Sequence, residues 1–320
     1  MKKEPATLRQ IINNYGTTFA FILAIIVFSI ISKRFFSVEN FQNILVQSTS
    51  LGICAFGLTL VLIAGEIDLS YGGLIGLVGA VLAGMLKQGY SPLFVSLVIL
   101  AIGLTTGLLN AILIVGLKLP SFLASVAVMF LCMGTERVYN LGITTWIRDP
   151  QVLSIVQAYI GPVPAPAIYL FGVFVICYFL QTQTRTGQYV RALGENIDAV
   201  KEVGIRANLT KAAVFVVAAV LFTFAAYIET LRNGGATMFA GRQILLYVLA
   251  ASFLGMATFK AGKANFPGTL IGALFLYTIT SGLAGLGIKY YLVPVVQGII
   301  LIIAVAISSA RRGKIEQIQF

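Results

Sequence analysis

The polar stretch that decides the topology of this chain reads GENIDAVKEVGI at residues 194–205. It lies in a charged segment, 185–211, between two long apolar runs. The side-chain oxygen of Asn196 can cap a short helix, and Asp198 suits the positive N-terminal end of that helix. Lys201 lies nearer the negative end, and Gly204 can adopt the left-handed conformation that ends a helix. We therefore expect one or two helical turns in water between two membrane spans.

The composition is that of a membrane protein. Hydrophobic residues make up 58% of the 320 residues, and the mean hydropathy is +0.95, whereas soluble domains contain about 45–50% apolar residues. The net charge is +11 with no His, but the Lys and Arg residues fall in the loops and so indicate orientation rather than nucleic-acid binding. Cys54, Cys132 and Cys177 lie in apolar runs without metal-like spacing, and we expect free buried thiols.

The apolar runs predict an all-α polytopic membrane protein with about ten transmembrane helices. A bilayer core about 30 Å thick needs roughly 20 apolar residues per helix. The second and third runs are rich in glycine and separated by only a few residues, so one of them could be broken. We expect a single transmembrane domain over residues 1–320. The runs are 15–32, 41–64, 70–86, 92–117, 121–142, 167–182, 210–231, 243–259, 265–286 and 290–310.

The distribution of Lys and Arg predicts that both termini are cytoplasmic, because most of these residues then fall on the inner side. This orientation also places 185–211 in the cytoplasm and 143–166 outside. Three prolines at alternate positions, 162–166, exclude a continuing helix there and favour an extended crossing. The outer segment is either part of a surface that receives a binding protein or a structural linker.

A second polar segment, GEIDLSYGG at 65–73, follows the second apolar run. Carboxylates beside a membrane span are costly unless they reach water, a cation or backbone donors. Asp68 or Ser70 can cap the next helix, and Gly72 and Gly73 give that helix a small-residue face for close packing. Residues 268–272, GTLIG, echo GGLIG at 72–76, either by internal duplication or by chance.

Two charged pairs lie near the outer ends of predicted spans. Glu229 and Arg232 are three residues apart and can pair on one helix face. Glu136 and Arg137 are adjacent and point in different directions. They either reach the outer interface, or one of them lines the pathway.

Uncharged polar residues within the spans are the candidates for lining a translocation path, although any one of them can instead bond to helix backbone. Together they suit a neutral, hydroxyl-rich cargo such as a sugar. A proton-driven carrier would need mid-membrane Asp, Glu or His chains. The path-lining candidates are Gln47, Thr49, Thr59, Asn110, Ser125, Tyr247, Ser252 and Thr280.

No phosphate-binding loop of the form Gly-x-x-x-x-Gly-Lys-Ser/Thr occurs in the sequence, so nucleotide binding is expected from another chain. Without His, no Ser/His/Asp or Cys/His grouping is possible. We therefore do not expect an enzyme, and we expect no cofactor or metal bound by this chain.

Both polar segments resemble bacterial ATP-binding-cassette (ABC) importer permeases of the ribose, xylose and galactose type. Residues 65–73 resemble the signature Gly-Gly-Ile-Asp-Leu-Ser-x-Gly, with Glu66 in place of the second Gly. Related branched-chain amino-acid permeases lack its Ile-Asp-Leu-Ser core. Residues 194–205 resemble the cytoplasmic coupling loop Gly-x-Asn-x-x-Ala-Ala-x-x-x-Gly-Ile, in which a short helix docks on the ATPase. Val200 replaces the second Ala of that pattern, and its bulk could change the fit to the ATPase.

This resemblance implies two sets of functional residues. The residues expected to couple to the ATPase are Gly194, Glu195, Asn196, Asp198, Ala199, Lys201, Gly204 and Ile205. The residues of the family signature, which could form a gate, are Gly65, Asp68, Leu69, Ser70, Gly72 and Gly73.

The resemblance also implies a multi-pass permease of the bacterial inner membrane that imports a pentose or hexose. Its partners would be a second permease subunit, identical or not, an extracytoplasmic solute-binding protein, and cytoplasmic ATPase subunits that bind ATP and Mg. One alternative is a permease of the same architecture for a nucleoside, a vitamin or a furanosyl autoinducer. Another is a secondary transporter or channel driven by an ion gradient.

Overall fold

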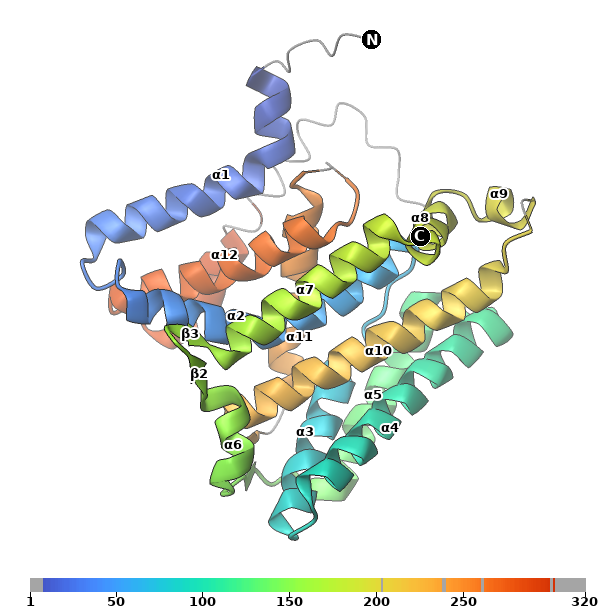
Figure 1. Ribbon diagram of the computed structural model, residues 1–320, viewed down its shortest axis with the longest axis horizontal. Helices are drawn as coiled ribbons and strands as arrows, with labels where there is room; N and C mark the ends of the chain where they lie inside the picture. The colour runs from blue at the N-terminus through green and yellow to red at the C-terminus, as the bar shows by residue number, and fades with distance from the viewer. Residues whose placement is uncertain (1–7, 203, 238–239, 260–261, 300–301, 303–320) are drawn as a thin grey trace.

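The computed structural model describes residues 8–202, 204–237, 240–259, 262–299 and 302, and these residues are mainly helical (Figure 1). The helices are α1 (Leu8–Ile31), α2 (Val38–Ile63), α3 (Tyr71–Lys87), α4 (Pro92–Ala111), the π-helix η1 (Ile112–Gly116), α5 (Ser121–Asn140), α6 (Pro150–Gln157), α7 (Ala165–Gln183), α8 (Arg185–Glu195), α9 (Ile197–Glu202), α10 (Ala207–Arg232), α11 (Ala240–Met256), α12 (Phe266–Gly285) and the 3-10 helix η2 (Tyr290–Leu292). The strands are β1 (Thr145–Trp146), β2 (Tyr159–Ile160), β3 (Val163–Pro164) and β4 (Gly235–Ala236).

Apolar helices confirm an all-α polytopic membrane protein. In the described part of the chain, six helical stretches are long and apolar enough to cross a membrane: α2, α4 with η1, α5, α7, α10 and α12. Three further apolar helices are shorter: the part of α1 from Tyr15 to Ile31, the whole of α3, and the whole of α11. Each of the first nine runs expected from the sequence coincides with one of these helices. The tenth, 290–310, extends beyond the described residues, of which 293–299 are helical.

The helix α2 is continuous over 26 residues, so the helical conformation is interrupted after α2 rather than within it. Residues 64–70, here called the α2–α3 segment, carry the chain from the end of α2 to the start of α3. The helix α3 has only 17 residues, shorter than the roughly 20 that a full crossing needs. The glycine-rich third run is therefore a short helix entered through an irregular segment.

The succession of a long helix and a short helix, seen in α2 and α3, occurs a second time in the chain with the long helices running in opposite directions. The helix α10 also has 26 residues, and the helix that follows it, α11, also has 17. Glu66, just after α2, pairs with Lys211 at the start of α10, so α2 and α10 pack antiparallel (Figure 1). Such inverted halves are common in transporters.

The two short helices cross at their N-terminal turns. A Cβ added to Gly241 of α11 would lie 2.1 Å from the carbonyl oxygen of Gly72 in α3, and only glycine allows this approach. The structural counterpart of α3 is thus α11. The sequence echo at 268–272 lies at the start of α12 instead.

Residues 143–166 fold more compactly than the expected extended crossing. They contain α6, whose N-cap Asp149 accepts a hydrogen bond from the backbone N–H of Gln151, and the antiparallel strand pair β2–β3, while β1 pairs antiparallel with β4, which follows α10. Within the proline run 162–166, the strand conformation is confined to Val163 and Pro164 in β3. Pro166 lies in the first turn of α7, where a missing backbone N–H costs little.

Candidate functional site

The helix α9 has the caps that the sequence predicts. Asn196 Oδ1 accepts hydrogen bonds from the backbone N–H groups of Asp198 at 3.0 Å and Ala199 at 3.1 Å. Lys201 Nζ lies 2.9 Å from Asp198 Oδ1. Gly204 has a φ of +76°, which ends the helix in the left-handed conformation. These expected local features are confirmed.

The preceding helix, α8, was not expected from the sequence. It has 11 residues, and Thr184 caps it by accepting a hydrogen bond from the backbone N–H of Gly187 at 3.1 Å. Its buried residues are Gly187, Val190 and Leu193, a helical spacing of three. That weak periodicity is the only sequence signal for α8, and charged residues around it obscure the pattern.

One face of α9 is exposed and the other is packed on the protein. Asp198, Ala199, Lys201 and Glu202 are exposed, whereas Val200 is only 2% exposed. Val200 therefore faces the body of the protein and not the exposed face of α9. The expectation that its bulk changes the fit to an ATPase stays a prediction.

The end of α8 is joined to the α2–α3 segment through backbone and charge. A Cβ on Gly194 would lie 2.1 Å from the carbonyl oxygen of Ile63, and one on Gly65 would lie 3.2 Å from Gly194 Cα. Glu195 pairs with Lys263, close to the start of α12. The candidate coupling residues therefore contact the family-signature residues directly, which the sequence did not indicate.

Asp68 is buried at the centre of the α2–α3 segment. It is 0% exposed, and its Oδ1 accepts a hydrogen bond from the backbone N–H of Ser70 at 2.8 Å. Asn110 Nδ2 lies 3.3 Å from Asp68 Oδ2 and 3.0 Å from Ser70 Oγ. Asp68 thus accepts a backbone hydrogen bond just before α3, whereas the N-cap residue Ser70 makes no side-chain cap bond and its hydroxyl accepts from Asn110. Protein donors therefore surround this carboxylate, as a buried charge requires.

The other signature residues pack α3 against its neighbours. Leu69, Gly72 and Gly73 are buried. A Cβ on Gly73 would lie 2.2 Å from the carbonyl oxygen of Met129 in α5. The predicted small-residue face of α3 is therefore confirmed.

Most of the path-lining candidates make hydrogen bonds inside the fold. The hydroxyls of Thr59 and Thr269 are 2.7 Å apart, and Ser252 Oγ lies 3.4 Å from the carbonyl oxygen of Ala55. The hydroxyls of Thr49, Ser125 and Thr280 bond to backbone carbonyls of their own helices, at Leu45, Phe122 and Leu276 respectively. Gln47 and Tyr247 are half-buried. These candidates are spread over several helices, and their role in lining a path stays a prediction.

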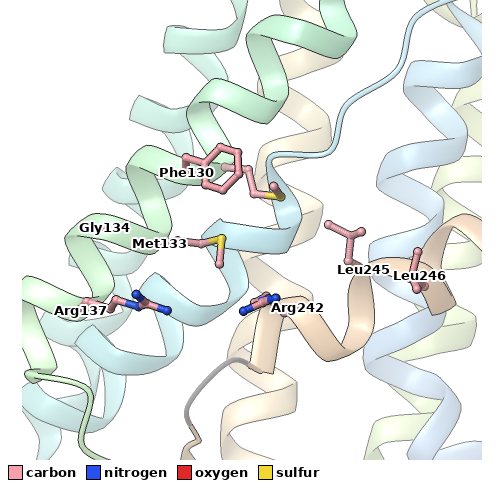
Figure 2. Close-up of a pocket in the computed structure, with 8 residues that line it drawn as sticks. Phe130, Met133, Gly134, Arg137, Arg242, Leu245 and Leu246 are labelled. Atoms are coloured by element: carbon pink, nitrogen blue, oxygen red, sulfur yellow. The ribbon is translucent and has the colours of Figure 1, made fainter.

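The two charged pairs near the C-terminal ends of α5 and α10 behave differently. Arg232 Nη2 donates to Glu229 Oε1 at 2.7 Å, as predicted. Glu136 is buried against Gly76 and does not reach the outer interface. Arg137 is exposed and lines a pocket together with Arg242 of α11 (Figure 2).

Comparison with known proteins agrees with this architecture. Residues 40–305 match the family model described as "Branched-chain amino acid transport system / permease component". The ribose import permease protein RbsC of Haemophilus influenzae is 34% identical over 290 residues, covering 89% of this chain and 90% of that protein. The ribose import permease protein RbsC of Bacillus subtilis is also 34% identical, with 89% of each chain covered.

The D-allose transport system permease protein AlsC of Escherichia coli is 28% identical and covers 96% of this chain and 94% of its own length. No solved structure matches the chain. The family model and the ribose permeases each span most of the sequence, and the apolar helices fit a multi-pass protein of the inner membrane. The chain therefore belongs to this family of transport-system permease components.

Proposed function

We propose that this chain is the transmembrane permease subunit of an ABC importer that carries a monosaccharide, a pentose or hexose. The observation that carries the proposal is the exposed, capped helix α9, joined through Gly194 to the α2–α3 segment. The cargo class is supported by relatives named for ribose, allose and galactose that match nearly the whole chain. The family description names branched-chain amino acids, but the signature at 65–73 favours the sugar group.

The proposed topology has ten spans in one transmembrane domain over 1–320, with both termini and 185–211 in the cytoplasm and 143–166 outside. The proposed partners are a second permease subunit, a solute-binding protein on the outer side and ATPase subunits on the inner side. ATP and Mg would be bound by the ATPase, and this chain would bind neither nucleotide nor cofactor.

In the proposed mechanism, the exposed face of α9 docks on the ATPase. Asp198, Ala199 and Lys201 provide that face, and Asn196 and Gly204 fix the two ends of the helix. When the ATPase closes, α8 moves with α9, and the contact between Gly194 and the end of α2 transmits the displacement. The α2–α3 segment leads directly into α3, so its displacement changes the crossing of α3 and α11. Asp68, Ser70 and Asn110 tie the same segment to α4, which would move with it.

The test is a substitution on the docking face, measured in proteoliposomes that contain the permease, its ATPase and its loaded binding protein. Ala199→Asp places a bulky charge at an exposed position of α9, and we expect loss of ATP-driven uptake with normal membrane insertion. Ala199→Ser, which adds only a hydroxyl, is the matched control and should retain uptake. Unimpaired uptake by A199D would contradict the coupling role.

Uptake that persists without the ATPase and collapses with a proton or sodium gradient would instead indicate a secondary transporter.

A further inference from the structure

A groove lies between α5 and α11 (Figure 2). Its volume is about 610 Å³, and its lining includes Met129, Phe130, Met133, Arg137, Arg242 and Leu245. Small-molecule sites are typically clefts of about 300–1,000 Å³ with mostly apolar walls and a few polar groups. The groove has this size and this mixture of groups.

The floor of the groove lies over the first turn of α3. A Cβ on Gly72 would lie 2.3 Å from Leu245 Cδ1 and 3.0 Å from Met129 Sδ. The absence of a side chain at Gly72 therefore lets Leu245 and Met129 close over α3. Since Gly241 approaches the same glycine, the groove lies where the two short helices cross. A change in that crossing would reshape the groove.

Two arginines border the groove. Arg137 lies near the end of α5, and Arg242 lies in the first turn of α11; both are exposed. Figure 2 shows their guanidinium groups turned toward each other across the space between the two helices. Charged side chains within membrane helices are costly toward lipid and usually face protein or a water-filled cavity. This side of α5 and α11 is therefore suited to a wet path rather than to acyl chains.

The chemistry of the lining fits a polyhydroxylated ring. Each guanidinium carries five N–H donors in a fixed plane, and hydroxyl and ring oxygens of a sugar accept such bonds. Phe130, 62% exposed, offers an aromatic face for the C–H groups of the ring. Met129 and Met133 are flexible thioethers that adapt to ligand shape. Polar donors at one end and an apolar floor match the two faces of a monosaccharide.

We infer that this groove is a stopping site for the cargo inside the permease. Arg137 and Arg242 donate hydrogen bonds to sugar hydroxyls, while Phe130, Met129 and Met133 hold the apolar side of the ring. The inference rests on the proposed function and adds to it a binding site with named residues. It also assigns to this chain a share in choosing which sugars pass.

The test uses the permease reconstituted with its ATPase and loaded binding protein, with ribose, allose and galactose as probes. We expect Arg137→Gln and Arg242→Gln each to slow ribose uptake about tenfold, on the order of one lost charge-assisted hydrogen bond. Arg34→Gln is the matched control, because Arg34 is exposed between α1 and α2 and does not line the groove, so its replacement should leave uptake unchanged. Membrane insertion and basal ATP hydrolysis are measured for all three variants.

A second measurement keeps both arginines intact. Leu246, which is 70% exposed and lines the groove, is replaced by Cys in a chain whose three native cysteines are Ala. We expect millimolar ribose to slow labelling of L246C by a water-soluble maleimide, and not to slow labelling of V138C, on α5 outside the groove. Uptake by R137Q and R242Q equal to that by R34Q, together with no protection of L246C, would overturn the groove site and leave the proposed function standing. Failure of the unaltered complex to take up any of the three sugars would reject the proposed function itself.

Discussion

Gly194 of α8 lies against the end of α2 so closely that a Cβ on it would be 2.1 Å from the carbonyl oxygen of Ile63. The contact joins the segment proposed to meet the ATPase with the segment that leads into α3. No flexible side chain lies between them, because the neighbouring atoms are backbone. In the proposed mechanism, this backbone contact passes a displacement of α8 to α2.

The first prediction is that Gly194→Ala impairs both stability and transport. The added methyl group forces α8 away from α2, and overpacking of this kind costs about 1–3 kcal/mol. We expect a lower thermal midpoint of the purified permease and fewer sugar molecules imported per ATP hydrolysed. Gly172→Ala is the control, because a Cβ there meets no atom within 4 Å. Equal transport stoichiometry in the two variants would contradict the proposed joint.

The second prediction concerns the ion pair of Glu66 and Lys211, whose side chains are 18% and 17% exposed. A double-mutant cycle with Glu66→Gln and Lys211→Met should give a coupling free energy of about 1 kcal/mol or more, since partial burial reduces screening. The same cycle on Asp198 and Lys201, which are 79% and 57% exposed, should give a value near zero. Thermal unfolding in detergent measures both cycles. Equal coupling free energies in the two pairs would contradict the expectation that partial burial strengthens the Glu66–Lys211 pair.

The sequence alone predicted the helical spans and the caps of α9 well. These features depend on neighbours in the chain: an apolar run of sufficient length, an Asn at the start of a helix, and a Gly at its end. Asn196 and Gly204 accordingly lie where they were expected. Local signals of this kind are complete within one apolar run or one short helix.

What the sequence did not predict depends on contacts between distant residues. Asn110 was selected only as a polar residue in a span, and its partner Asp68 is 42 positions away. The direction of Val200 depends on how α9 packs on the body of the protein. The approach of Gly72 to Gly241 requires the crossing of α3 and α11. The spacing of apolar residues and the identity of capping residues carry no information on contacts between residues that are far apart in the sequence.

The third prediction follows from the buried cluster of Asp68, Ser70 and Asn110. Asn110→Ala removes donors from a carboxylate that is 0% exposed, and we expect a loss of about 1–3 kcal/mol in the free energy of unfolding. Asp68→Asn should be milder, because its amide oxygen can still accept from the Ser70 N–H. Denaturation in detergent, followed by fluorescence, compares the two. A greater loss for D68N than for N110A would indicate that the charge itself is needed, against this account.

The fourth prediction tests the orientation on which the coupling mechanism depends. In a chain with Cys54, Cys132 and Cys177 replaced by Ala, Lys201→Cys places a thiol on the exposed side of α9 and Tyr159→Cys places one in the outer segment, where Tyr159 is 58% exposed. A charged maleimide cannot cross the bilayer, so in intact cells it should label Y159C and spare K201C. Inside-out vesicles should reverse this pattern, which controls for the intrinsic reactivity of each thiol. Labelling of K201C in intact cells would place α9 on the outer face, where no cytoplasmic ATPase could act on it.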